Sequence, residues 1–121
     1  MENYYSVVVF DKLDLPDNIT KEEIEERHLK DIDGFYRTHF GDIWPCAIYP
    51  NAEDAIETVE KNITDIREDC YEYALVEEYA YGLYPHLLSC KLYKWDYEQK
   101  RFVSHHHCML DKWFQGFTFF H

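Results

Sequence analysis

The amino-acid sequence predicts an α+β protein in which two helices pack on one face of a mixed or largely antiparallel sheet of about five strands, in the order β-α-β-α-β-β-β. Three features indicate this class: short runs of β-branched and aromatic residues, two capped segments with helical spacing, and two strand-like runs around a polar turn. The chain has 121 residues, of which 46% are hydrophobic and 18% aromatic. This length and composition favour one globular α+β domain that spans residues 1–121.

The first strand and the first helix are predicted near the amino terminus. Residues 4–10 form a β-branched and aromatic run that ends at Asp11, which is typical of a buried strand leading into a loop. Thr20 and Glu23 form a capping-box pattern, so a short helix is predicted from there to Asp31. A thin apolar stripe places this helix on the surface; it consists of Ile24, Leu29 and Ile32.

The middle of the chain predicts an aromatic loop, a strand and a longer helix. Turn residues dominate residues 33–42, which are interpreted as a loop. Residues 44–49 predict the second strand, with Pro45 near its start. Asn51 is a suitable N-cap for an amphipathic helix over residues 51–66. The residues expected to be buried along this helix are Ala52, Ala55, Ile56, Val59 and Ile63.

The carboxy-terminal half of the sequence predicts the remaining strands. Residues 71–80 alternate between two mixed faces, as in a strand. Residues 90–95 and 101–107 flank the polar segment 96–100, which predicts a β-hairpin with a longer turn. The aromatic segment 113–120 predicts a last strand, and Gly116 in its middle indicates a bulge or a close approach.

The charge balance argues against nucleic acids and anionic membranes as direct partners. The chain carries 12 Lys and Arg against 24 Asp and Glu, a formal net charge of −12. Direct binding to DNA, RNA or an anionic membrane is disfavoured because such binding depends on clustered cations. The acidic amino terminus does not resemble a signal peptide, and no apolar run is long enough to span a bilayer, so a cytoplasmic location is expected.

A cytoplasmic address predicts reduced cysteines. The four cysteines have no CxxC spacing, so they are interpreted as packed thiols; they are Cys46, Cys70, Cys90 and Cys108. Reactive thiols need a basic or helix N-terminal setting, which this acidic chain does not provide around them.

The histidine run 105–107 is the sharpest local motif. On a strand, His105 and His107 would point to the same face, which is a workable start for a zinc site. A third ligand would come from elsewhere, with His86, Cys90 and His121 as candidates. The alternative interpretation is that these are surface histidines at the end of a strand.

Three stretches of the sequence resemble a family. They are residues 72–79 (EYALVEEY), 82–85 (GLYP) and 92–96 (LYKWD). The pattern is similar to small uncharacterised α+β proteins of bacterial genomes and mobile elements. Since that family has no assigned activity, the resemblance implies a fold and no catalytic residues.

Two functions of different classes follow from these features. The first is a non-enzymatic, acidic protein-binding module, with partner-binding residues predicted at Glu53, Glu57, Glu60, Tyr93 and Trp95. Its more specific form is a nucleic-acid-mimicking inhibitor of phage or mobile-element type, whose partner would be a nucleic-acid-binding protein. The alternative is a small zinc or thiol-dependent enzyme that uses the cluster from His105 to Cys108. Phosphate-binding loops, HExxH motifs and dinucleotide fingerprints are absent from the sequence.

Overall fold

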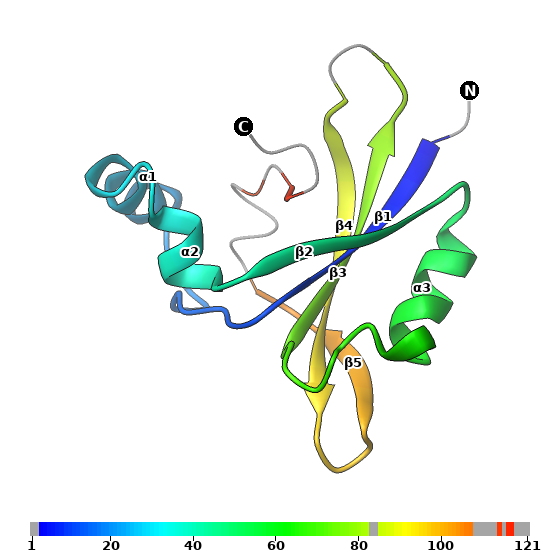
Figure 1. The fold of residues 1–121 in the computed structure, drawn as a ribbon. Coiled ribbons are helices and arrows are strands. Elements are labelled where there is room, and N and C mark those ends of the chain that lie inside the picture. Colours follow the sequence, from blue (N-terminus) through cyan, green and yellow to red (C-terminus); the bar gives the residue numbers. More distant parts are fainter. Residues whose placement is uncertain (1–2, 83–84, 108–113, 115, 118–121) are drawn as a thin grey trace.

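The protein is an α+β fold built on one antiparallel sheet (Figure 1). The computed structural model describes residues 3–82, 85–107, 114, 116 and 117. In these residues the strand order is β2-β1-β3-β4-β5, with strands β1 (Asn3–Phe10), β2 (Ile43–Tyr49), β3 (Tyr73–Ala80), β4 (Leu87–Asp96) and β5 (Arg101–His105). The helices are α1 (Lys21–Lys30), α2 (Phe35–Phe40), α3 (Ala52–Glu60) and a single 3-10 turn, η1 (Ile63–Asp65). The predicted α+β class and five-stranded sheet are confirmed.

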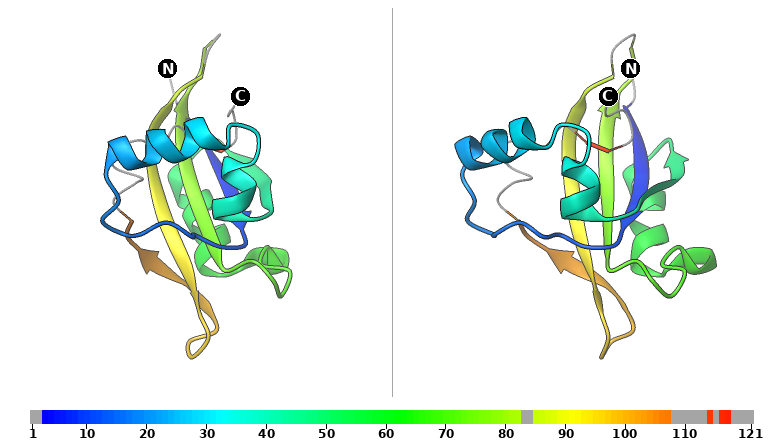
Figure 2. Two further views of the ribbon diagram at one scale, coloured as in Figure 1. Left: turned by 90° about the vertical axis from the view of Figure 1, so that its left-hand side faces the viewer. Right: turned by 60° about the vertical axis from the view of Figure 1, so that its left-hand side comes forward.

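The sheet lies between helices on both of its faces. Along β1, Val7 and Val9 point to the face covered by α3, while Val8 and Phe10 point to the face covered by α1 and α2. Figures 1 and 2 show α3 on one side of the sheet and the α1–α2 segment on the other. Both predicted helices were expected on one face of the sheet. The difference follows from the central strand, because a run that is apolar on both faces needs cover on both.

The helices α1 and α2 pack through few side chains. The Thr20 hydroxyl caps α1 by accepting a hydrogen bond of 3.1 Å from the Glu23 N–H, as predicted. Of the predicted apolar stripe only Ile24 is buried, whereas Leu29 and Ile32 are 73% and 64% exposed. Helix α2 lies where a loop was expected, since Gly34 and Gly41 flank the helical turn rather than interrupt it. Its two buried aromatic residues are Phe35 and Phe40.

Helix α3 is shorter than predicted. Its N-cap is Asn51, whose Oδ1 accepts a hydrogen bond of 2.9 Å from the Asp54 N–H, as expected. The helix ends at Glu60 because Asn62 adopts a left-handed conformation with φ of 47°. Ala55 and Val59 are buried as predicted, but Ile63 lies beyond the helix and is 38% exposed. Residues 61–72 join α3 to β3 and form the connector.

The predicted hairpin is confirmed as β4 and β5, which pair from Asp96 opposite Arg101 to Leu92 opposite His105. Strand β5 ends at His105, so His106 and His107 lie beyond its pairing with β4. Most of the predicted last strand, 113–120, lies outside the described residues, and Phe114, Gly116 and Phe117 are not in a strand. None of the described helices is long and apolar enough to cross a membrane.

Candidate functional site

Helix α3 and the connector carry a continuous run of exposed carboxylates. The predicted residues Glu53, Glu57 and Glu60 are exposed and lie on one side of α3, at i, i+4 and i+7. Four more exposed acidic side chains accompany them: Asp54, Asp65, Glu68 and Asp69. These seven residues define the α3–connector surface. Residues 51–72 contain eight acidic and two basic residues, so this segment holds −6 of the net charge of −12.

Both basic residues of this segment are engaged within the protein. Lys61 Nζ lies 3.3 Å from the Glu57 carboxylate, one helical turn away. Arg67 is only 9% exposed and its guanidinium group points into the fold. Its Nη2 atom lies 3.3 Å from the Glu72 carboxylate and donates to the Tyr97 hydroxyl at 3.1 Å. Arg67 Nη1 also lies 4.0 Å from the exposed Asp69 carboxylate, so the two cations are shared among Glu57, Asp69 and Glu72 and no ion pair joins them to the remaining carboxylates of the α3–connector surface among the described residues.

The predicted hairpin residues are less accessible than expected. Tyr93 is 1% exposed and belongs to the core between the sheet and α3, so its ring offers no surface to a partner. Trp95 is half-buried, and the Arg67 guanidinium lies 4.5 Å from the centroid of its ring. That ring already has a cation on its face. The carboxylates of the α3–connector surface are therefore accessible to a partner, whereas the face of the Trp95 ring is already covered by Arg67.

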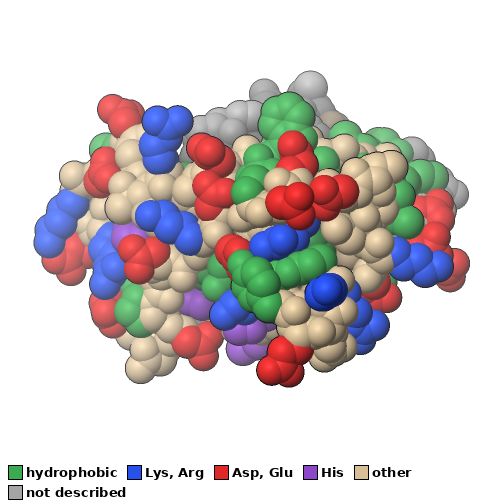
Figure 3. Space-filling model, turned by 60° about the horizontal axis from the view of Figure 1, so that its bottom comes forward, with side chains coloured by type: hydrophobic (Ala, Val, Ile, Leu, Met, Phe, Trp, Pro, Cys, Tyr) green, Lys and Arg blue, Asp and Glu red, His purple; other side chains and the backbone are tan. Residues whose placement is uncertain are grey.

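The end of the molecule that carries the hairpin turn has a mixed character. Tyr97 is 63% exposed and donates a hydrogen bond to the Glu72 carboxylate, which raises the pKa of the tyrosine. Figure 3 shows apolar side chains near the middle of this lower face, with basic and acidic side chains around them. The face around the hairpin turn is therefore mixed in charge, unlike the acidic run along α3 and the connector.

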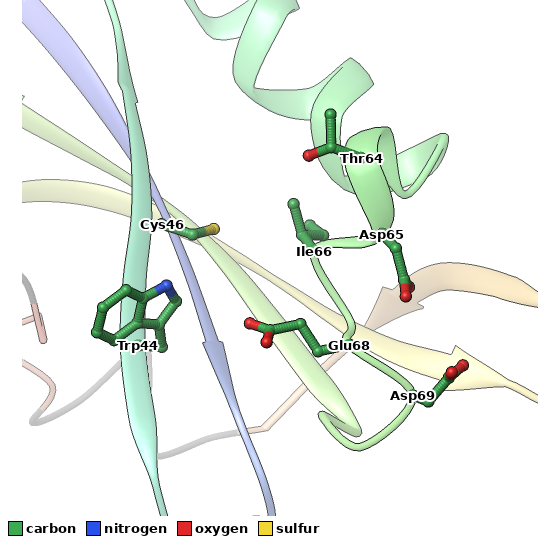
Figure 4. A pocket seen from close by; sticks show the side chains of 7 residues that line it. All are labelled: Trp44, Cys46, Thr64, Asp65, Ile66, Glu68 and Asp69. Atoms are coloured by element: carbon green, nitrogen blue, oxygen red, sulfur yellow. The ribbon is translucent and has the colours of Figure 1, made fainter.

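A groove separates the edge strand β2 from the connector. Trp44, Cys46, Thr64, Asp65, Ile66, Glu68 and Asp69 line this open space of about 540 Å³. Trp44 is 55% exposed and comes from β2, while the carboxylates come from the connector. In Figure 4 the Glu68 side chain extends toward β2, and the Asp69 side chain points away from Trp44. The groove therefore places an aromatic ring opposite a carboxylate.

The strand β2 has an irregularity at this groove. Val7 pairs with Ala47 and Val8 pairs with Pro45, so Cys46 is the extra residue of a β-bulge. Its thiol donates a hydrogen bond of 3.4 Å to the Val7 carbonyl. Burial, with a smaller contribution from the nearby Glu68 carboxylate, raises the pKa of Cys46 to about 11. This is the opposite of the setting that activates a nucleophilic thiol.

The other described cysteines differ in burial: Cys90 is half-buried, whereas Cys70 is exposed and does not fit the predicted packing role. Cys46, Cys70 and Cys90 are in the reduced thiol form, as expected, while Cys108 lies outside the described residues. Desolvation raises the pKa of Cys70, and the Asp11 carboxylate adds to the shift. Neither Cys46 nor Cys70 therefore has the lowered pKa that an activated thiol needs.

The two predicted zinc ligands have different surroundings. His105 is exposed at the end of β5. Partial desolvation of its ring lowers its pKa, and the positive charge of Lys94 lowers it by a smaller amount. His107 is 4% exposed, and its Nε2 lies 2.9 Å from the Leu15 carbonyl oxygen, so this nitrogen donates a hydrogen bond. Both line a pocket of about 260 Å³. Within residues 3–82, 85–107, 114, 116 and 117, no three His, Cys, Asp or Glu side chains are placed to hold a metal ion.

Comparison of the chain with protein-family models, with curated proteins and with solved structures found no match. The resemblance to small proteins of bacterial genomes and mobile elements therefore stays a prediction. Function is inferred from the surface itself.

Two features were not predicted from the sequence: Trp44 in the groove and the exposed carboxylates of the connector. One signal for Trp44 was present, because a proline within a strand is typical of an edge strand and Pro45 follows it directly. The first half of the connector was predicted as the end of the helix over residues 51–66, and residues 67–70 were assigned to no element, so the position of Glu68 opposite β2 was not anticipated. The departure of the connector from helical geometry depends on left-handed residues, and these are Asn62, Thr64, Asp65, Glu68 and Asp69.

Proposed function

We propose that this protein is a non-enzymatic module that binds a basic partner protein through the α3–connector surface. The observation that carries the proposal is the set of seven exposed carboxylates within residues 53–69, in a segment whose only two cations are engaged internally. Complementary charge of this kind accelerates association and selects partners. Partner contacts are centred on Glu53, Glu57 and Glu60, which the sequence had singled out.

A defined basic peptide tests this proposal. The probe is a fluorescently labelled peptide of alternating lysine and threonine, and the readout is the anisotropy of the label at low and high salt. We expect binding at low salt that weakens as salt is added, because exposed charges are screened over about 10 Å at 0.1 M. A peptide in which norleucine replaces each lysine serves as the uncharged probe and should not bind.

Charge-neutral variants locate the binding surface. Glu53, Glu57 and Glu60 changed together to Gln should weaken peptide binding on the order of tenfold. A matched triple variant changes three exposed carboxylates elsewhere, Glu22, Glu25 and Glu98, to Gln and alters the net charge equally. This control should bind like the parent. Equal weakening by both triple variants would mean that only net charge matters, and a parent that does not bind the peptide would overturn the proposal outright.

The nucleic-acid-mimicking form of the proposal makes one further claim about the partner. Glu53, Glu57 and Glu60 are spaced by about 6 Å and 4.5 Å along the helix axis, so they form a row of negative charge on one side of α3. A protein that recognises phosphates could accept such a row in its binding channel. In that case excess duplex DNA should compete with this protein and release its partner. A partner that stays bound in excess DNA would instead indicate a basic protein that does not use its nucleic-acid site.

A further inference from the structure

We infer that the groove between β2 and the connector takes one cationic side chain, lysine or arginine, from the basic partner protein. This inference rests on the proposed function and names one contact within it. The Trp44 ring would face the cation and the Glu68 carboxylate would balance its charge. The ring of tryptophan is the strongest aromatic partner for a cation among the protein side chains.

The walls of the groove suit a side chain with an apolar stem and a charged end. Trp44, Cys46 and Ile66 provide apolar surface, and Asp65 and Glu68 provide negative charge. Lysine and arginine bury their methylene stems against such surface while the charged group remains near water. The groove is open and measures about 540 Å³, which leaves room for a side chain to enter from a separate protein.

The protein already contains an arrangement of this kind. The Arg67 guanidinium lies 4.5 Å from the centroid of the Trp95 ring, and its Nη2 is 3.3 Å from the Glu72 carboxylate. Tryptophan, cation and carboxylate therefore pack together stably within this fold. Trp44 and Glu68 repeat the aromatic and acidic parts on the surface, and among the described residues no cation lies on the Trp44 ring.

The charge and the strand geometry favour a basic partner over a second copy of this chain. A second copy docked symmetrically on the groove would bring two α3–connector surfaces together, and like charges oppose that approach. Pro45 has no N–H to donate, and the bulge at Cys46 interrupts the ladder, so β2 is a poor edge for pairing with another strand. Contact through a side chain in the groove avoids both obstacles.

Substitutions in the groove test the inference with the same lysine–threonine peptide. Trp44→Ala should weaken binding roughly two- to thirtyfold, and Trp44→Phe should weaken it less because a ring remains. Glu68→Gln should weaken binding roughly three- to tenfold, whereas Asp69→Asn, the same charge change on a side chain that points away from Trp44, should have little effect. Circular dichroism of each variant confirms that the fold is retained.

A spectroscopic readout reports the contact directly. The indole N–H signal of Trp44 in a proton–nitrogen correlation spectrum, assigned by its loss in Trp44→Phe, should shift when the lysine peptide is added and stay in place with the norleucine peptide. Sedimentation of the free protein at rising concentration should show a monomer. A dimer whose formation shifts the same indole signal would instead assign the groove to a second copy and overturn the inference.

The outcomes separate this inference from the proposed function. A peptide that binds and is weakened by the α3 triple variant, but not by Trp44→Ala or Glu68→Gln, overturns the groove contact and leaves the acidic surface standing. A peptide that does not bind the parent overturns the proposed function. Weakening by both sets of variants, together with the indole shift, supports both.

Discussion

The backbone N–H of Phe117 donates a hydrogen bond of 2.6 Å to the carboxylate of Glu77, which is fully buried in β3. The same carboxylate accepts hydrogen bonds of 3.1 Å from the hydroxyls of Ser6 in β1 and Tyr79 in β3. An isolated buried carboxylate is strongly destabilising, so these donors account for its presence in the core. Glu77 thereby ties the carboxy-terminal segment to the middle of the sheet.

Substitution of Glu77 by Gln should destabilise the protein. The amide keeps the shape of the side chain, but its NH₂ cannot accept: in one orientation it opposes the Phe117 N–H, and in the other it removes the acceptor of the Ser6 and Tyr79 hydroxyl protons. A mismatch of this kind costs about 1–3 kcal/mol of the free energy of unfolding, measured by urea denaturation. Glu53→Gln on the exposed face of α3 is the control and should stay within about 0.5 kcal/mol of the parent. A Glu77→Gln variant with the parent's midpoint would contradict this account of the buried carboxylate.

Gly116 should not tolerate a side chain. Its φ is +91°, and a Cβ atom there would overlap the Tyr79 hydroxyl that donates to Glu77. Gly116→Ala should therefore lower the melting temperature more than Gly82→Ala, because Gly82 also has positive φ but no atom of the described residues lies within 4 Å of a Cβ added there. The overlap should account for a difference of about 1–3 kcal/mol between the two variants. Equal melting temperatures would show that the carboxy-terminal segment does not pack there.

Local signals in the sequence located most helices and strands. The face of the sheet that each helix covers and the end of α3 depend on tertiary packing and backbone conformation. The caps at Thr20 and Asn51 and the strand runs depend on neighbouring residues, so pattern alone identified them. The face that each helix covers depends on residues far apart in the chain, and no local pattern contains it. The end of α3 depends on the left-handed conformation of Asn62, which asparagine tolerates but does not require.

The candidate site was partly predictable for the same reason. Helical spacing was enough to place Glu53, Glu57 and Glu60 on one exposed side, because they lie within α3 itself. Tyr93 was expected at a partner interface because tyrosine is common there, but the alternation of β4 turns its ring to the core. The groove at Trp44 joins two segments that only the folded chain brings together.

Val59 and Ile63 should respond differently to the same substitution, although the helical pattern predicted both to be buried. Val59 is 0% exposed and Ile63 is 38% exposed. Val59→Asp places an unpaired charge in the core and should cost several kcal/mol, roughly 3 or more, or prevent folding. Ile63→Asp should change the free energy of unfolding by less than about 1 kcal/mol. Comparable losses for the two variants in thermal melts would indicate that the helix continues through Ile63.

The stability of the protein should depend on pH through Glu78. Hydrogen bonds from Ser89 at 2.7 Å and Asn3 at 2.7 Å, and a longer one from Tyr5, hold the pKa of this carboxyl below its usual value. A lowered pKa in the folded state stabilises the protein above the unfolded pKa of about 4.3, and the contribution is lost as pH falls through the folded value. Glu78→Gln should therefore be less stable than the parent at pH 7, with a difference that shrinks as the pH falls below 4. A difference that is constant from pH 7 to pH 3 would argue against ionic hydrogen bonding at this site.

Cys46 should react slowly with alkylating reagents in the folded protein. Since burial raises its pKa to about 11, only about 0.1% of the thiol is ionised at pH 8, against roughly a quarter of an ordinary thiol. Carboxamidomethylation of Cys46, followed by mass spectrometry of its peptide, should accelerate about tenfold for each pH unit between 8 and 10. The chain unfolded in urea is the control and should react with the profile of an ordinary thiol. The slope separates ionisation from access, because poor access lowers the rate equally at every pH. A native rate that levels off near pH 8.5 would mean that the thiol ionises normally, and the groove would then have to be reconsidered as a setting for thiol chemistry.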